Sequence, residues 1–468
     1  MYLYLIVPFR THFSLKSSSY VSLGDAYKNF WKNFAAKLDA NEQKKISLLH
    51  QPKGKNMRFK VIHEDSNLLR EEILKINEDE KIKTLIKEVV YEQNKIYFPN
   101  NQNEKINFVE GTSNFTLFDN TIGIFEITLE IPSAFFHELD SFIENIQHWG
   151  NDVCNKIVQT TYNDTILPLI KKIVNFDKNR KFIANIENHY GFPDISKKKN
   201  LLIHKAQTGQ PLWVNRTLIQ NQDSKINPDL INKWIFTHSS ITDIINTLEQ
   251  YNDDEKNSAY LGWGNNFIYN EINSHVVKDA KKALLLSQYY YGVLDSLNIN
   301  LSYIVGQSNY ISKFKESKNY NSLLKELVNI VSIIRVGYID TLQNFQGDRE
   351  FFFRQVIESW SIPELFENIE QKSNVCKEKI SEIYKHSMKK SQFIVELLLF
   401  FLGGISLLEF VNTLITFWSN KTGIKDDIPG LYDLGAQFSP DGLLWSGTIL
   451  LIVFFILYSN YFIKGSKE

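Results

Sequence analysis

The sequence predicts an α/β cytoplasmic body followed by a long stalk helix and two C-terminal transmembrane helices. Strand and amphipathic helix patterns alternate before residue 361, a helix start signal stands at Ser361, and two long apolar segments lie near the C-terminus. The predicted parts are an N-terminal α/β domain (1–175), a second α/β to helical domain (176–360), the stalk (361–392), a first span (393–418), an external loop (419–442), a second span (443–463) and a tail (464–468).

Charge and cysteine content indicate a body in a reducing compartment. Lys and Arg number 52 against 53 Asp and Glu, so no excess of charge indicates a nucleic-acid partner. Cys154 and Cys376 are the only cysteines in the sequence, too few for a disulfide framework, as is usual for cytosolic proteins. The N-terminal run MYLYLIV ends at Pro8 and lacks a basic leader, so we interpret it as a buried strand and not as a signal peptide.

Within the body, period-two and helical patterns predict strands mixed with helices. The predicted strands are residues 2–7, 57–63 and 114–131, the last a hairpin turning near 119–123, and then LLIHKAQTG and PLWVNRTLIQ. The predicted helices are residues 23–40, 67–91, 133–174 with a break at Pro168, 229–251, and further helices between 274 and 347. No repeat or linker marks a boundary, so residue 175 is an arbitrary division between the two predicted domains.

A helix start signal opens the stalk. In Ser361-Ile362-Pro363-Glu364, Ser precedes Glu by three residues and Pro lies in the first turn. No Pro or Gly follows until Gly403, so one unbroken helix is predicted from residue 362 to residue 418. Spacings of four and three give it an apolar seam with small polar interruptions, formed by Ile362, Phe366, Ile369, Ser373, Cys376, Ile380, Ile383 and Ser387. Either this seam packs on copies of itself, or it covers the core of the body.

Two apolar segments predict membrane spans. Residues 393–418 and 443–463 are each long enough, at ~1.5 Å per residue, to cross a ~30 Å hydrocarbon layer. Two buried soluble helices are the alternative, but two such lengths in tandem are unusual for them. The basic residues that flank the pair are Lys385, Lys389, Lys390, Lys464 and Lys467. By the positive-inside rule both termini then face the cytoplasm, which predicts a multi-pass protein of the cell inner membrane.

The first apolar segment has one polar face. It contains two carboxylates, although a charge at the bilayer centre costs at least ~2.5 to 3.5 kcal/mol. Steps of three and four residues place its polar groups together, namely Glu396, Ser406, Glu409, Asn412, Thr413 and Thr416. Such a face predicts a pore-lining helix that favours cations. In the alternative, Glu409 is protonated or paired with the second segment, and Ser and Thr only support helix packing.

Two short segments of the body are candidates for binding a flat, anionic ligand. Gly262-Trp263-Gly264-Asn265-Asn266 combines glycines that let a backbone approach a ligand with a stacking ring and amides that suit adenine; a plain turn is the alternative. Trp213 and Arg216 place a ring and a planar cation three residues apart, in what is otherwise an ordinary half-exposed strand. No metalloprotease, Cys-x-x-Cys, Walker, nucleophile-elbow or dinucleotide-binding motif occurs in the sequence, so no enzyme activity is predicted.

An α/β body, a long helix that continues into the first of two C-terminal spans and a short basic tail: this order resembles the CorA family of divalent-cation channels. The resemblance covers the plan of the whole chain and, in residues, only the part from Ser361 on. It implies a homopentamer in the lipid bilayer whose first spans line a pore. The family's Gly-Met-Asn motif is absent, and Trp418-Ser419-Asn420-Lys421-Thr422-Gly423 stands in its place. Asp426 and Asp427 in the external loop could attract cations instead.

The chain is also similar to divergent CorA-like membrane effectors of type III CRISPR systems, through its altered mouth and large body. The resemblance implies antiviral defence and a gating ligand made of S-adenosylmethionine and AMP. We therefore expect a CorA-like oligomeric channel, gated by its cytoplasmic body through a nucleotide second messenger. A transporter of Mg²⁺ or another divalent cation is the second hypothesis, and a membrane-anchored binding or scaffold protein is the third.

Overall fold

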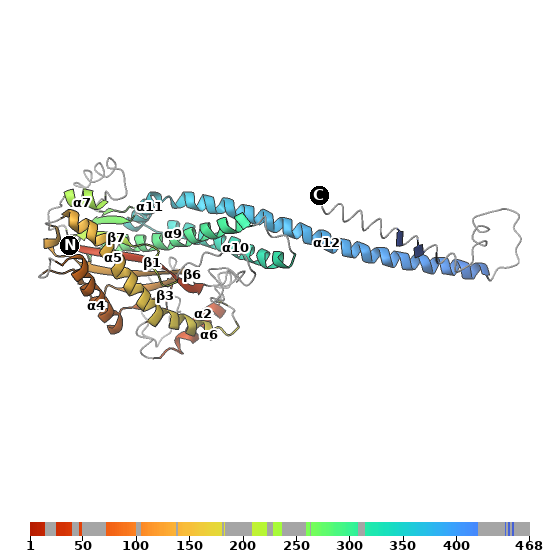
Figure 1. Cartoon of the computed structure of the whole chain (residues 1–468), viewed down its shortest axis with the longest axis horizontal. Coiled ribbons are helices and arrows are strands. Elements are labelled where there is room, and N and C mark those ends of the chain that lie inside the picture. The colour runs from red at the N-terminus through yellow and green to blue at the C-terminus, as the bar shows by residue number, and fades with distance from the viewer. Residues whose placement is uncertain are drawn as a thin grey trace. The chain divides into compact units, whose positions relative to one another are not determined.

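The computed structural model of the chain is shown in Figure 1. It describes residues 1–14, 25–39, 46–48, 72–99, 104–136, 139–179, 182, 208–221, 228–235, 259–262, 264–307 and 314–419, with five isolated residues between 445 and 453. Residues Met1–Ile380 form one compact unit and Ser381–Glu468 form a second. The boundary between them lies inside a single long helix.

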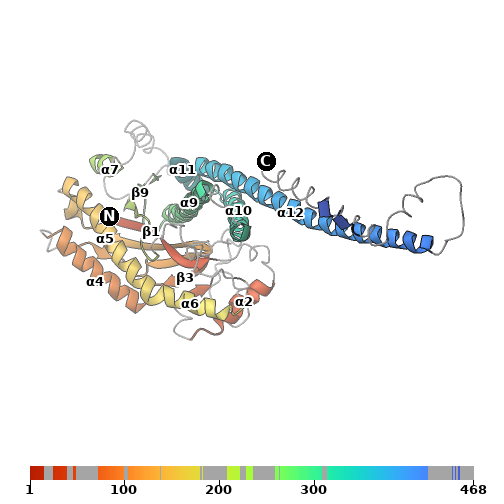
Figure 2. The same ribbon diagram turned by 45° about the vertical axis from the view of Figure 1, so that its right-hand side comes forward.

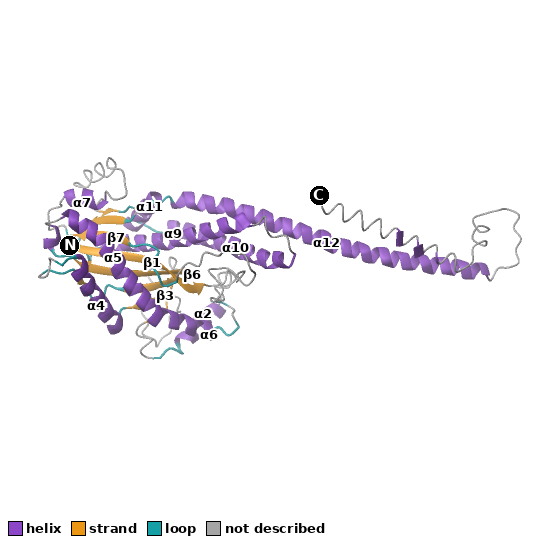
Figure 3. Cartoon of the chain, viewed as in Figure 1, coloured by secondary structure: helices purple, strands orange, loops and turns teal. Residues whose placement is uncertain are grey.

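One mixed sheet organises the first unit (Figure 3). Its strands are β1 (Tyr2–Ser14), β2 (Ile46–Leu48), β3 (Glu72–Asn77), β4 (Asn107–Phe108), β5 (Asn114–Phe118), β6 (Asn120–Glu130), β7 (Asn215–Gln220), β8 (Ala259–Tyr260) and β9 (Asn265–Tyr269). The order is β2-β3-β5-β6-β1-β7-β9-β8, with β4 paired to β6. All of these pairs are antiparallel except β7 with β9, which are parallel. Strands from both predicted domains therefore share one sheet.

Helices cover both faces of this sheet. The α-helices are α2 (Asp25–Ala35), α4 (Glu80–Tyr97), α5 (Leu139–Thr161), α6 (Leu167–Phe176), α7 (Pro228–Ile235), α9 (His275–Gln307), α10 (Phe314–Asn344), α11 (Asp348–Ser359) and α12 (Ile362–Ser419). A short 3₁₀ turn (Ser133–Phe136) precedes α5, and a π-helical turn (Tyr162–Ile166) joins α5 to α6. Figure 2 shows β1 and β3 between α4, α5 and α6 on one side and α9 and α10 on the other.

The central strand β1 shows how the sequence produces these layers. Side chains of successive strand residues point to opposite faces. Leu3 and Leu5 belong to the apolar core that α4, α5 and α6 cover, and both are fully buried. Tyr4 points to the other face, where Lys281 of α9 lies over its ring at 4.3 Å. A strand that is buried on both faces has a continuous apolar sequence. The run MYLYLIV has this character, and the prediction of a buried strand is confirmed.

The helix predicted for residues 67–91 is wrong in its first part. Residues Glu72–Asn77 form β3 and pair with β5, because Leu74 and Ile76 alternate into the core. The helix begins only after Asp79, whose carboxylate accepts a hydrogen bond from the backbone N–H of Ile82 at 2.8 Å. The predicted hairpin of 114–131 is confirmed as β5 and β6. The predicted strand 57–63 and most of LLIHKAQTG lie outside the described residues.

The stalk helix is confirmed, and its seam covers the body. Helix α12 begins at Ile362, as the start signal predicted, and runs to Ser419. Ile362 and Ile369 are fully buried, and Ser373 and Cys376 are 2% and 1% exposed within one chain. Up to residue 376, the seam therefore covers the core of the body, as one of the two interpretations predicted. The side chains of Ile380, Ile383 and Ser387 lie outside the described part.

The predicted transmembrane helices are not supported and are corrected here. In the part of the chain that the structure describes, no helix combines the length and the apolar character needed to cross a bilayer. Segment 393–418 contains Glu396 and Glu409, and carboxylates in hydrocarbon are costly. Nearly all of segment 443–463 falls outside the described residues. The multi-pass location in the inner membrane depended on both spans and is corrected with them.

Candidate functional site

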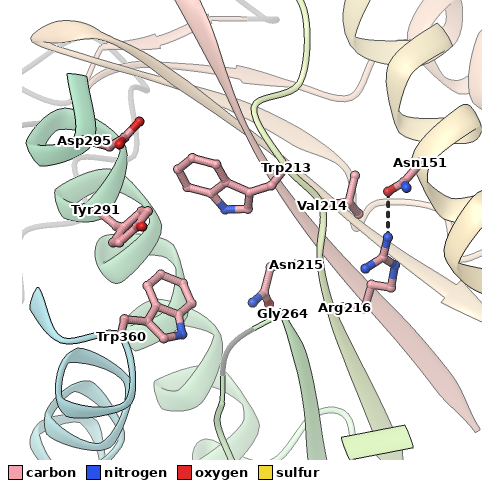
Figure 4. Close-up of a pocket in the computed structure, with 9 residues that line it drawn as sticks. All are labelled: Asn151, Trp213, Val214, Asn215, Arg216, Gly264, Tyr291, Asp295 and Trp360. Atoms are coloured by element: carbon pink, nitrogen blue, oxygen red, sulfur yellow. Dashed lines mark hydrogen bonds between the residues drawn. The ribbon is translucent and has the colours of Figure 1, made fainter. Parts of the chain in front are cut away.

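A cavity of about 490 Å³ opens in the first unit where strands β7 and β9 begin. This volume lies within the usual range of small-molecule pockets. Residues at the start of β7 and just before it line the cavity. The other lining residues come from α5, the turn before β9, α9, and the junction of α11 with α12. The lining residues, drawn in Figure 4, are Asn151, Trp213, Val214, Asn215, Arg216, Gly264, Tyr291, Asp295 and Trp360.

Three aromatic rings form one wall of the cavity. Tyr291 meets Trp213 edge-on with ring centroids 5.4 Å apart, and it meets Trp360 edge-on at 5.7 Å. Both indole N–H groups are engaged: Trp213 donates to the side-chain oxygen of Gln288, and Trp360 donates to the carbonyl oxygen of Gly262 at 3.0 Å. The ring planes are thereby held in place before any ligand arrives.

Arg216 stands on the other side of the cavity (Figure 4). Its Nη2 donates to the side-chain oxygen of Asn151 at 2.6 Å and to the carbonyl oxygen of Gln147 at 3.2 Å. The side chain is only 9% exposed, and its Nε has no hydrogen-bond partner among the described residues. No carboxylate within the described part of the chain forms an ion pair with it. Burial lowers the pKa of this guanidinium.

The floor between these two sides is an amide network. Asn215 is 1% exposed, and its side-chain oxygen accepts a hydrogen bond from Nδ2 of Asn266 at 2.7 Å. Its own Nδ2 finds no partner among the described residues. The side-chain oxygen of Asn266 in turn accepts from the backbone N–H of Gly262 at 2.8 Å. A buried amide donor without a partner is costly, so the site has hydrogen-bonding capacity that its own residues leave unused.

Asp295 adds a carboxylate beside the aromatic wall. Burial raises the pKa of this carboxyl, while the positive charge of Arg10 opposes the shift. Burial and the charge of Asp295 also raise the pKa of Tyr291. Burial thus disfavours the charged form of both groups. The Tyr291 hydroxyl can donate and accept hydrogen bonds, and Asp295 when ionised accepts from amino or hydroxyl groups.

The structure brings together two of the residues that the sequence singled out. Trp213 and Arg216 both line the cavity, from opposite sides of the chain where it enters β7. Asn265 and Asn266 do not line it, because Asn265 donates to the carbonyl oxygen of Trp234 at 3.0 Å and Asn266 belongs to the amide network. The segment is the turn between β8 and β9, which was the alternative interpretation. Trp263 lies outside the described residues.

The predicted pore residues lie along α12. Side chains of Ser406, Glu409, Asn412 and Thr413 are exposed, and that of Glu396 is partly exposed. Thr413 donates to the carbonyl oxygen of Glu409 at 2.8 Å, one turn back, and Gln392 donates to the carboxylate of Glu396 at 3.0 Å. The side chain of Thr416 and both loop acids, Asp426 and Asp427, lie outside the described part. Their role in a pore stays a prediction.

Sequence reasoning missed most of the cavity. Asn151, Tyr291, Asp295 and Trp360 stand on helices or at a helix end and belong to no local motif. One local signal was present, because three consecutive tyrosines end at Tyr291 and are followed by Gly292. A Cβ at position 292 would lie 3.7 Å from the Trp213 ring, an ordinary contact, so the backbone of α9 runs close to the aromatic wall at this glycine.

Comparison of the chain with family models, with curated proteins and with solved structures gives no match. Within the described residues, no group of three or more His, Cys, Asp or Glu side chains is placed to hold a metal ion. The cavity therefore has to be interpreted from its own chemistry.

Proposed function

We propose that this chain is a receptor for a small ligand that carries an anionic group and a flat ring, as a nucleotide does. The observation behind the proposal is Arg216, a buried guanidinium that lines a cavity and has no carboxylate partner among the described residues. An aromatic wall lines the same cavity from the other side of the chain at β7. A cation for an anionic group and rings for a flat base, in a cavity of suitable volume, support the proposal.

The energetics favour an anionic ligand. Removing a charge from water costs several kcal/mol unless an opposite charge or good hydrogen bonds compensate. The two neutral acceptors of Arg216 compensate this cost in part, and its buried Nε has no partner among the described residues. A phosphate placed beside the guanidinium would supply the missing charge, and arginine matches phosphate geometry with two parallel hydrogen bonds.

The aromatic wall supplies the second half of the recognition. Stacking of a base on an aromatic side chain contributes about 1–3 kcal/mol per base. Asp295 and the unpartnered Nδ2 of Asn215 offer an acceptor and a donor for the polar edge of a heterocycle or for ribose hydroxyls. This division suits a purine nucleotide better than a purely apolar or a purely charged ligand.

We do not propose the channel that the sequence predicted, because no helix in the described part of the chain supports the transmembrane spans that a channel requires. The ligand-binding half of that expectation is retained as a proposal. The conjugate of S-adenosylmethionine and AMP, which the resemblance implies, combines a purine, a phosphate and a second purine-bearing cation, and it belongs in the set of ligands to be tested.

Calorimetric titration of the full chain with adenosine, AMP, S-adenosylmethionine and the conjugate tests the proposal. We expect AMP or the conjugate to bind at least about 10-fold more tightly than adenosine, since a hydrogen bond to a charged group contributes about 1.5–3 kcal/mol. Arg216→Gln should remove this difference. Arg335→Gln, which changes an exposed arginine paired with Glu370, is the matched control and should leave it intact. Equal affinities for adenosine and AMP, or binding of none of the four, would contradict the proposal.

Self-association through α12 is a second proposal, for the second unit. Ile394, Leu398, Leu402 and Ile405 are 51–61% exposed, and their spacings of four, four and three place them on one helical face. Exposed apolar faces of this kind mark interaction sites, and a helical stripe is complementary to the same stripe on an identical helix. A second copy of this chain is therefore the occupant that we propose for this face.

A further inference from the structure

We propose that occupancy of the cavity is passed to the first turns of α12 through Trp360 and the residue after it, Ser361. This inference rests on the proposed ligand site and adds a regulated output to it. All the residues involved lie within the first unit. Ligand binding can change a conformation only through contacts that differ between two states, so the route has to be shown residue by residue.

The junction between α11 and α12 is very short. Helix α11 ends at Ser359 and α12 begins at Ile362, so that Trp360 and Ser361 alone connect them. Ser361 has φ of +49°, in the left-handed region that residues other than glycine rarely adopt. Such a conformation costs on the order of 1 kcal/mol and persists only where the surroundings impose it. The connection is therefore held under strain by its neighbours.

Trp360 is the neighbour that links this junction to the cavity. Its side chain lines the cavity and is 6% exposed. The indole N–H donates to the carbonyl oxygen of Gly262, and the ring meets Tyr291 edge-on. A ligand that stacks on the Trp360 end of the aromatic wall contacts or displaces this indole.

The amide network offers a second connection to the same point. Asn215 accepts from Asn266, Asn266 accepts from the N–H of Gly262, and Gly262 accepts from Trp360. The chain of hydrogen bonds begins at the Asn215 amide, whose Nδ2 has no partner among the described residues, and ends at the indole. A ligand acceptor that engages Asn215 thus acts on the hydrogen bond that fixes Trp360. Polar groups in such buried networks polarise one another and respond together.

On the other side of Ser361, the start of α12 cannot move independently. The backbone N–H of Leu365 donates to the carbonyl oxygen of Ser361 at 3.1 Å, so Ser361 closes the first helical turn. Ile362 and Ile369 are fully buried, and Phe366 packs on Tyr338 with ring centroids 4.7 Å apart. Close-packed protein interiors move between discrete arrangements. A shift of Trp360 is therefore either absorbed at Ser361 or passed to these turns.

Amide hydrogen exchange of the full chain, with AMP as the probe, tests the route. In the unchanged protein we expect saturating AMP to alter exchange of the backbone amides of residues 364–372 by at least about threefold. Glycine at position 361 tolerates many backbone conformations and would absorb a shift of Trp360. Ser361→Gly should therefore keep the calorimetric affinity for AMP within about twofold and lose most of the exchange response.

Ser332→Gly is the matched control, since it places the same change at an exposed position of helix α10. It should keep both the affinity and the exchange response. If AMP binds and the α12 amides do not respond, or if Ser361→Gly responds as the unchanged protein does, the inference is wrong while the receptor proposal stands. If AMP does not bind at all, the inference is wrong, and the receptor proposal fails with it when none of the four titrated ligands binds.

Discussion

The ring of Tyr291 stands edge-on to the indole of Trp213, with the two planes at 81°. Edge-to-face pairs of this kind contribute about 0.5–1.5 kcal/mol beyond the area that they bury. Because Tyr291 holds a similar position toward Trp360 at 78°, one tyrosine orients both indoles. The geometry of the wall is therefore fixed by helix α9, and the binding predictions depend on it.

Removing one ring should weaken binding of the base. We expect Trp213→Leu to lower the affinity for adenosine about 10-fold, because it removes the stacking surface and keeps an apolar side chain. Tyr91→Leu changes an exposed aromatic residue on α4 and serves as the control. Calorimetric titration measures both. Unchanged adenosine affinity in Trp213→Leu would show that the base does not bind at this wall.

Two glycines should respond oppositely to alanine. A Cβ at Gly292 would make ordinary contacts, 3.4 Å from Ile122 and 3.7 Å from Trp213, and alanine stabilises a helix interior by about 0.5–1 kcal/mol over glycine. Gly292→Ala should therefore raise the free energy of unfolding by up to that amount. At Gly123 a Cβ would lie 2.7 Å from a ring carbon of Phe9, and Gly123→Ala should lower it by about 1–3 kcal/mol. Urea unfolding distinguishes the two signs.

Lys281 should give the fold a measurable pH dependence. Burial between α9 and the sheet lowers the pKa of its ammonium from 10.5 to about 8, against the opposing charge of Glu126. Below pH 8 both folded and unfolded chains carry this proton, and the full cost of the buried charge is present. From about pH 8 towards 10.5 the unfolded chain binds more protons than the folded one, so stability rises with pH.

Replacing this lysine should remove that rise. We expect Lys281→Met to be more stable than the unchanged protein at pH 7.5, with the difference shrinking towards pH 9.5 by at most ~1.4 kcal/mol per pH unit. Lys278→Met, at an exposed position of the same helix, is the control for the loss of a lysine. Chemical unfolding at a series of pH values is the measurement. A constant difference for Lys281→Met would mean that its ammonium is not destabilised by burial.

Helix α12 should determine the mass of the particle. We expect light scattering of the full chain to give a particle mass of at least twice the 54.6 kDa of one chain. Leu398→Lys with Leu402→Lys places charges on the exposed apolar face and should shift the mass towards that of one chain. Lys substitution at Glu378, an exposed position of α12 outside this face, is the control. A single-chain mass for the unchanged protein would contradict self-association.

Local sequence signals predicted the elements whose cause is local. The position at which α12 starts was predicted from Ser361 and Pro363, and the hairpin of β5 and β6 was predicted from alternating apolar residues. The segment Glu72–Asn77 was assigned to a helix because its partner β5 lies far along the chain, and strand pairing outweighed a weak helical pattern. The apolar character of 393–418 was interpreted as a membrane span and its two carboxylates as part of a pore, but no helix in the described part has the length and apolar character that a span requires.

The cavity was only partly predictable for a related reason. Trp213 and Arg216 stood out because a ring and a cation occur close together in sequence. Arg216 is a candidate anion-binding residue because it is buried and has no acidic partner in the described part of the chain. Its position depends on contacts with α5, which the sequence alone does not show. Asn266 was chosen for its amide chemistry, which is present, but the fold uses it to connect Asn215 with Gly262.

The cavity draws its lining from positions as far apart as Asn151 and Trp360. No truncated chain that ends before Trp360 can therefore complete it, and neither can a nascent chain still short of that residue. A ligand that recognises only the finished site would raise stability by about 2.7 kcal/mol at 100 times its dissociation constant. Retention on an immobilised ligand would thus separate correctly matured molecules from incomplete ones during purification.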